Sequence, residues 1–102
     1  MAFSELAQLI EQNSSGVGAF EKAAERAFAA AHQYPHLAAA YFILAAEAAE
    51  FADSYDRMPV TKAISDAAQE KFAKHASDLD SVSNEPAKLI ETLNRIVAEN
   101  LS

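Results

Sequence analysis

The stretch HLAAAYFILAAEAAEF, residues 36–51, is the most apolar part of the chain. No residue from Leu37 to Ala46 is charged, and the first acidic residues after it are Glu47 and Glu50. A membrane-spanning helix needs about 20 consecutive apolar residues, and this run of ten is too short. A helix that is apolar on every side is normally surrounded by other helices. The stretch therefore predicts a central packing helix, either wholly enclosed or half buried and half an interface with a second copy of the chain.

Five segments of the chain place apolar residues at helical spacing, and turn-forming or helix-breaking residues separate them. They cover about residues 3–13, 17–32, 35–55, 59–80 and 86–101. Alanine, the strongest helix former, is the commonest residue, and the 102 residues include only two glycines and three prolines. The sequence predicts an all-α fold, a compact antiparallel bundle of four to five helices that forms one domain over residues 1–102.

The breaks between these segments predict how individual helices end and begin. Gly16 follows the polar run NSS, and we expect it to take the left-handed backbone that ends the first helix. Pro35 suits the first turn of the third helix. Ser83 or Asn84 is expected to cap the last helix, with Pro86 in its first turn.

The charge balance limits the possible partners. Fifteen acidic residues outnumber eight basic ones, which gives a formal net charge of -7, and no basic run occurs anywhere. Such a surface repels phosphate backbones and anionic lipids. We therefore expect no nucleic-acid partner and no membrane association, whereas a basic protein partner would be attracted.

The N-terminus and the cysteine content bear on the compartment. The segment MAFSELAQLIEQN has no basic residues ahead of its apolar residues and contains Glu5, so it does not have the pattern of a secretory signal. The chain contains no cysteine, which excludes disulfides and thiolate zinc sites. These features predict a cytoplasmic protein.

Four carboxylates follow the apolar stretch at intervals of three residues, without a lysine or arginine among them: Glu47, Glu50, Asp53 and Asp56. Neighbouring members of this string lie side by side on a helix. Hard cations such as Mg²⁺ and Mn²⁺ take oxygen ligands of this kind, so a metal-dependent helical enzyme or a metal-binding protein is one interpretation. The string also lies opposite the apolar stripe of its helix, so a solvated surface is the other interpretation.

The remaining candidates for chemistry are histidines and aromatic residues. His32 and His36 are four residues apart, but Pro35 interrupts the helix between them, and the pair is not expected to converge on a metal. His75 has Lys71, Lys74 and Asp78 as near neighbours, which predicts a surface position. Neither a glycine-flanked nucleophile nor a phosphate-binding glycine loop occurs. The sequence therefore predicts no catalytic residue, no metal ligand set and no cofactor.

Aromatic residues gather around the third helix, where they could line a pocket for a small apolar ligand or form ordinary core. They are Tyr34, Tyr41, Phe42, Phe51 and Tyr55.

The N-terminal half carries a second pattern, in which aromatic, leucine and small residues alternate with helical spacing. Its members are Phe3, Leu6, Ala7 and Ile10, then Ala24, Phe28, Ala31 and Pro35, then Ala38, Tyr41, Leu44 and Ala45. Over residues 3–48 this pattern resembles the helix hairpins of tetratricopeptide repeats, although the turn NSSGV is longer than theirs. The resemblance implies helix hairpins that are used for protein recognition, and it carries over no ligand-binding residues.

The leading hypothesis is a small helical protein that acts through protein–protein interaction, as an adaptor, an inhibitor or an immunity-type protein, and that can form a homo-oligomer. Its contacts are expected on the helix of Leu37–Ala46 and on the acidic face that follows. The residues assigned to binding are Tyr41, Phe42, Leu44, Glu47, Glu50, Phe51, Asp53, Tyr55 and Asp56.

Overall fold

The computed structural model describes residues 2–102 of the chain. These residues form five α-helices, one short 3₁₀ helix and no β-strand, which confirms the predicted all-α fold. The helices are α1 (Ser4–Gln12), α2 (Val17–Gln33), η1 (Pro35–Leu37, the 3₁₀ helix), α3 (Ala38–Ser54), α4 (Lys62–Val82) and α5 (Pro86–Leu101).

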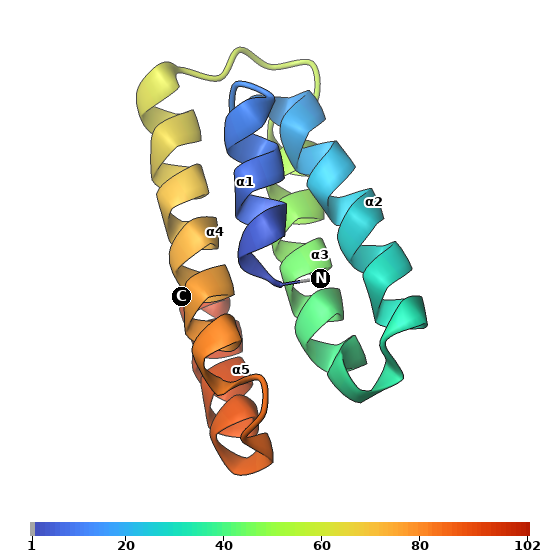
Figure 1. The fold of residues 1–102 in the computed structure, drawn as a ribbon. Coiled ribbons are helices and arrows are strands. Elements are labelled where there is room, and N and C mark those ends of the chain that lie inside the picture. The colour runs from blue at the N-terminus through green and yellow to red at the C-terminus, as the bar shows by residue number, and fades with distance from the viewer. Residues whose placement is uncertain (1) are drawn as a thin grey trace.

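Successive α-helices run in opposite directions along a bundle that measures 40 × 28 × 19 Å (Figure 1). α2 and α3 form the most extensive pair, and α1 packs against α2 and α4. α3 lies against α2, α4 and α5. α5 is at the edge of the bundle and, within residues 2–102, packs only against α4 and α3. This edge position leaves part of α3 uncovered.

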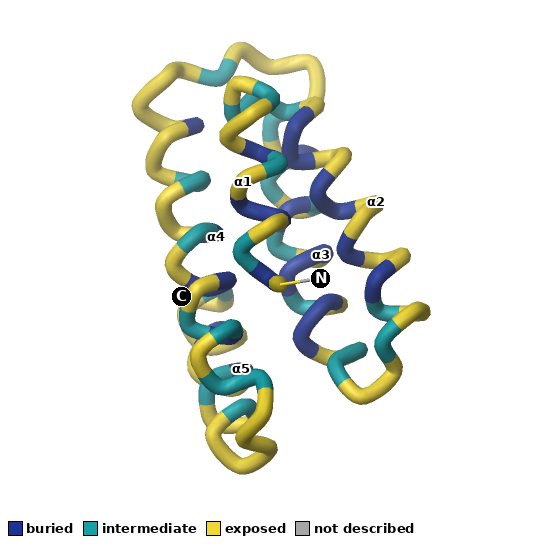
Figure 2. Tube along the Cα trace, viewed as in Figure 1, coloured by how far each residue is buried: buried dark blue, intermediate teal, exposed yellow. Residues whose placement is uncertain are grey.

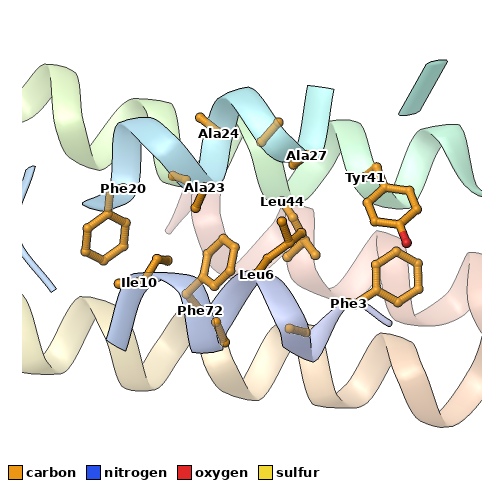
Figure 3. Packing of buried hydrophobic residues seen from close by; sticks show 14 of the residues in the cluster. Phe3, Leu6, Ile10, Phe20, Ala23, Ala24, Ala27, Tyr41, Leu44 and Phe72 are labelled. Carbon is orange, nitrogen blue, oxygen red and sulfur yellow. The ribbon is translucent and has the colours of Figure 1, made fainter. Parts of the chain in front are cut away.

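Alanines make the close contact between α2 and α3 possible, because a side chain of one methyl group lets two helix backbones approach. The buried alanines of this pair are Ala19, Ala23, Ala24, Ala27 and Ala30 on α2, and Ala40, Ala45, Ala48 and Ala52 on α3. Larger side chains fill the centre between this pair and the helices α1, α4 and α5 (Figure 3). They include Phe3, Leu6, Ile10, Phe20, Tyr41, Leu44, Phe72, Leu79 and Ile96.

The turn between α1 and α2 differs from the prediction. Gly16 has φ -84° and ψ 178° and is the extended N-cap residue of α2. Ser14 and Ser15 instead take the left-handed backbone, with φ 67° and 52°. Two hydrogen bonds hold this turn: the Ser15 N–H donates to the Ile10 carbonyl at 2.9 Å, and the Ser65 hydroxyl donates to the Ser15 carbonyl. The left-handed residues are therefore fixed by the tertiary fold.

Three other helix starts also differ. The third helix was expected from about residue 35, but residues 35–37 form the separate 3₁₀ helix η1 and α3 begins at Ala38. The fourth helix was expected from about residue 59, but α4 begins at Lys62, where the Thr61 hydroxyl accepts the Ile64 N–H at 3.2 Å. Neither Ser83 nor Asn84 caps α5, because the N-cap position belongs to Glu85, which makes no side-chain cap bond. Pro86 occupies the first turn as predicted.

The segment Leu37–Ala46, which was expected to lie at the centre, is a mixture of buried, half-buried and exposed residues (Figure 2). Its buried residues are Ala40, Tyr41, Leu44 and Ala45, and its exposed residues are Ala39, Phe42 and Ala46. The version of the prediction in which this helix is wholly enclosed is therefore wrong. Among the described residues, no helix combines the length and the apolar character that crossing a bilayer requires.

Candidate functional site

The structure places the nine residues assigned to binding in three kinds of surroundings. Tyr41 and Leu44 lie in the core, with no exposed surface. Partly buried residues are Glu47, Phe51 and Tyr55, and exposed residues are Phe42, Glu50, Asp53 and Asp56. Two clefts bring five of these residues together and share Glu47 and Glu50, and neither cleft includes Asp53 or Asp56.

Exposed and half-buried apolar side chains form a strip across α2, α3 and α5. The strip consists of Phe28, Phe42, Ile43, Val97 and Leu101. The rings of Phe28 and Phe42 meet edge to face with their centroids 5.8 Å apart, yet 40% and 58% of the two residues remain exposed. Phe42 and Ile43 line both a groove toward α2 and a groove toward α5, so the strip is continuous.

Polar groups border the strip at the end of the groove between α3 and α5. Glu47 and Glu50 of α3 and Asn100 of α5 line this groove beside Val97 and Leu101. The same three polar residues line a neighbouring cleft of about 180 Å³, whose aromatic wall is formed by Phe20, Phe51 and Tyr55. This cleft is open to the surface and Tyr41 does not line it, so it is not a pocket enclosed by the predicted aromatic group.

The aromatic wall of this cleft is a stack of three rings. Phe20 and Phe51 lie 4.2 Å apart between ring centroids, and Phe51 and Tyr55 lie 5.0 Å apart. Phe20 is buried while Phe51 and Tyr55 are partly exposed, so the stack leads from the core to the surface.

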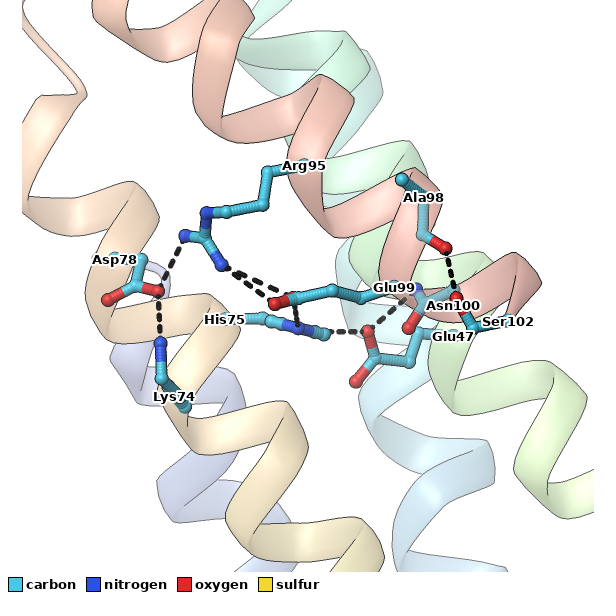
Figure 4. Close-up of polar contacts among 9 residues, drawn as sticks. All are labelled: Glu47, Lys74, His75, Asp78, Arg95, Ala98, Glu99, Asn100 and Ser102. Atoms are coloured by element: carbon cyan, nitrogen blue, oxygen red, sulfur yellow. Dashed lines mark hydrogen bonds and ion pairs between the residues drawn. The ribbon is translucent and has the colours of Figure 1, made fainter.

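Glu47 is also one end of a charged network that joins α3, α4 and α5 (Figure 4). Its centre is His75 of α4, which is only 2% exposed. The Nδ1 atom of His75 lies 2.6 Å from Glu47 Oε1, and its Nε2 atom lies 2.8 Å from Glu99 Oε2. The Asn100 side-chain amide donates to the same Glu47 oxygen at 2.9 Å. The ring therefore bridges two carboxylates from two different helices.

The network continues from Glu99 to the surface through alternating charges. Arg95 donates to both Glu99 oxygens at 3.2 Å and to Asp78 at 2.7 Å, and Lys74 donates to Asp78 at 3.0 Å. Ionised partners of this kind form the stronger class of hydrogen bonds.

These contacts shift the pKa values of the outer groups. The hydrogen bond from His75 is the main cause that lowers the pKa of Glu99 below its ordinary value, and Arg95 adds to it. Lys74 is the main cause that lowers the pKa of Asp78. The hydrogen bond to Asp78 raises the pKa of Arg95. Both carboxylates are therefore held in the ionised form that accepts these bonds.

The hydrogen-bonding inventory of imidazole decides the protonation state that fits this site. A carboxylate only accepts, and a neutral imidazole donates from one nitrogen only. Since both ring nitrogens of His75 lie against carboxylate oxygens, only the imidazolium satisfies both contacts. One oxygen of ionised Glu47 accepts from both the ring and the Asn100 amide. The arrangement is a buried cation clamped between two anions.

The predicted surface position of His75 is thus wrong. Its lysine and aspartate neighbours on α4 suggested a solvated face, but Phe72, His75, Ala76 and Leu79 follow the spacing of the buried stripe. The position of His75 in this stripe was the sequence signal that could have predicted its burial. Glu47 has the same signal, since it follows the buried Leu44 by three residues and is only 12% exposed at its side chain.

The other two histidines stay apart from this site. His32, near the end of α2, and His36, in η1, are both exposed. Among residues 2–102, no group of three or more histidine, aspartate or glutamate side chains is placed to hold a metal ion.

The comparisons with known proteins gave no match to a protein-family model, to a curated protein or to a solved structure.

Proposed function

We propose that this protein binds another protein, and that its apolar strip receives an amphipathic helix with basic residues along one edge. The observation that carries the proposal is Phe42, which is 58% exposed in the middle of a helix that packs against three others. Burial of an apolar ring is favourable, so a ring that is half exposed to water would gain free energy if a partner covered it. Exposed apolar patches of this kind mark interaction sites.

The shape of the strip favours a helix as its occupant. Two grooves meet at Phe42 and Ile43, one between α2 and α3 and the other between α3 and α5. A partner helix with apolar residues at positions i, i+3, i+4 and i+7 fits a groove of this kind.

The charge of the site favours a basic partner. Glu47 and Glu50 border the groove between α3 and α5, and the chain carries a net charge of -7. Lysines or arginines along the partner helix would meet these carboxylates and speed the association. A second copy of the chain would instead bring another seven negative charges toward the same surface.

The resemblance of residues 3–48 to tetratricopeptide-repeat hairpins supports the same proposal. Those hairpins serve protein recognition, and the resembling segment contains Phe28 and Phe42 of the strip. The partner helix would then bind on the side of α3 that α2 leaves uncovered.

A designed peptide tests this function before the natural partner is identified. The probe is a fluorescent amphipathic peptide of about 20 residues, long enough to be helical, with leucines on one face and lysines beside them. We expect it to bind, and we expect added salt to weaken the binding because the charges are screened. A peptide with glutamates in place of the lysines should not bind.

A pair of variants locates the binding. Phe42 and Met58 are both 58% exposed, but Met58 lies outside the strip, in the connection between α3 and α4. Phe42→Asp should weaken peptide binding by about tenfold or more, as loss of a central anchor does, while Met58→Asp should leave it unchanged. Equal effects of the two substitutions would contradict the proposal. A dimer that light scattering detects and that Phe42→Asp dissociates would assign the strip to a second copy instead.

A further inference from the structure

We infer that the protonation of His75 controls how firmly α5 is docked, and thereby opens or closes the groove between α3 and α5. The docking part of this inference stands by itself, and its consequence for partner binding rests on the proposed function.

α5 has few apolar contacts with the rest of the bundle. Its buried residues are Leu93 and Ile96, and Leu89 is partly buried against the core, whereas Ile90, Val97 and Leu101 stay 59%, 39% and 82% exposed. Two buried aliphatic side chains contribute little against the entropy of ordering a helix of 16 residues. The polar contacts of Glu99, Asn100 and Arg95 must therefore supply a substantial share of the docking.

Those polar contacts form one network around His75, whose ring Glu99 of α5 contacts directly. His75 holds α5 through Glu99 at 2.8 Å and α3 through Glu47 at 2.6 Å, and Asn100 of α5 holds the same Glu47 oxygen at 2.9 Å. When the ring loses its second proton, one of its nitrogens becomes an acceptor. That nitrogen then faces a carboxylate oxygen at hydrogen-bond distance with no proton between them, which is repulsive.

The charged groups around His75 explain why the network needs the positive charge of its imidazolium form. α3 contributes Glu47 and Glu50, α5 contributes Arg95 and Glu99, and α4 itself contributes Glu70, Lys71, Lys74 and Asp78. α1 also packs against α4, but the α4 carboxylate that it meets is Asp80, which accepts the Phe3 and Ser4 amides.

Within the hydrogen-bonded network, three negative charges balance three positive charges. The negative groups are Glu47, Glu99 and Asp78, and the positive groups are His75, Arg95 and Lys74. Deprotonation of His75 leaves this network with one uncompensated negative charge at its buried centre, where charge is most costly.

The consequence reaches the apolar strip directly. Val97 and Leu101 of α5 form one wall of the groove whose other wall is Phe42 and Ile43 of α3. The network residues Glu47 and Asn100 line the same groove. Loosening α5 therefore removes one wall of the strip, and a partner helix loses its contacts there.

Nuclear magnetic resonance of the intact chain tests the docking step without a partner. The ring protons of His75 report its protonation, and hydrogen exchange, corrected for its intrinsic pH dependence, reports the protection of the α5 amides. We expect α5 protection to fall by about tenfold or more as the ring deprotonates, which corresponds to losing one hydrogen bond to a charged group. The amides of α2 should keep their protection over the same range.

Variants separate this effect from general instability. His75→Gln should give α5 a low protection that no longer follows this transition, while His32→Gln, on the exposed end of α2, should behave like the native chain. If His75→Gln does not fold, Glu99→Gln gives the same test, because this half-exposed carboxylate joins the ring to α5. An α5 protection that stays constant while the His75 ring titrates would overturn the inference.

The cationic peptide tests the link to binding. Its affinity should fall over the same pH range as α5 protection, and both changes should be absent in His75→Gln. Unchanged affinity while α5 loosens would overturn the regulatory part of the inference. A peptide that binds at no pH would contradict the proposed function and leave the exchange result for α5 intact.

Discussion

The carboxylate of Asp80 accepts the backbone N–H of Phe3 at 2.7 Å, across 77 residues of sequence. Its other oxygen accepts the N–H of Ser4 at 2.9 Å. The first N–H groups of a helix lack partners within the helix, and α1 has no side-chain cap of its own from Phe3. A residue near the end of α4 therefore caps α1 and ties the first helix to the rest of the bundle.

Removing this cap should lower the free energy of unfolding. Asp80→Ala leaves two N–H groups without their acceptor, and we expect a loss of about 1–3 kcal/mol. Asp66 is the matched control, because it forms an exposed ion pair with Lys62 at 2.7 Å, and Asp66→Ala should cost at most about 1 kcal/mol. Urea denaturation measures both. Equal losses would mean that Asp80 does not cap α1.

The left-handed serines give a prediction of the opposite sign. Ser14 has φ 67°, a conformation that costs an L-residue about 1–2 kcal/mol and glycine almost nothing. After the greater chain entropy of glycine is subtracted, Ser14→Gly should raise the stability by up to about 1 kcal/mol. Ser83 has φ -58°, and Ser83→Gly should lower it by about 0.5–1 kcal/mol. A destabilising Ser14→Gly in thermal melts would argue against this turn.

The alanine packing of α3 predicts a sharp dependence on side-chain volume. Ala48 has no exposed surface, whereas Ala46, two residues earlier, is exposed. Ala48→Leu should destabilise the fold by about 1–3 kcal/mol through overpacking, and Ala46→Leu should change its stability by no more than about 0.5 kcal/mol. Denaturation of the two variants measures the difference. Tolerance of leucine at both positions would contradict this packing.

The buried Tyr41 phenol predicts a loss of stability at alkaline pH. Burial is the main cause that raises its pKa above the ordinary value, and Tyr34, Asp80 and Glu5 add to it. A folded-state pKa above the unfolded one gives stability that is complete below about pH 10 and is lost as the pH rises toward the folded value. Thermal melts should show this decline, and Tyr41→Phe should reduce it. An equally steep decline in the variant would rule out Tyr41 as its source.

Much of the fold followed from the sequence because each helix break carries its own signal. Pro86 opens α5 as expected, whereas Pro35, expected in the first turn of the third helix, opens the short 3₁₀ helix that precedes α3. The left-handed turn was assigned to Gly16 because glycine adopts it most easily. The Ser65 hydroxyl, 50 residues away, holds the Ser15 carbonyl instead, and no local pattern contains that contact.

The site was only half visible in the sequence. The sequence drew attention to the acidic string and to Phe42. Treating the whole string as one face of the helix grouped Glu47 with Asp53 and Asp56, although their surroundings differ. Glu47 turns toward His75, while Asp53 and Asp56 remain exposed. The side of α3 that remains exposed is determined by the position of α5 at the edge of the bundle. That position is part of the spatial order of the helices, which hydrophobic periodicity does not encode.

Under the proposed function the strip around Phe42 receives a basic amphipathic helix, and mapping the bound peptide on the chain locates the surface that receives it. Amide chemical shifts of the isotope-labelled protein, followed during titration with the cationic peptide, report which residues the peptide contacts. We predict that the largest changes occur at Phe28, Phe42, Ile43 and Val97. Changes confined to the outer faces of α1 and α4, or no saturable change at all, would contradict the claim.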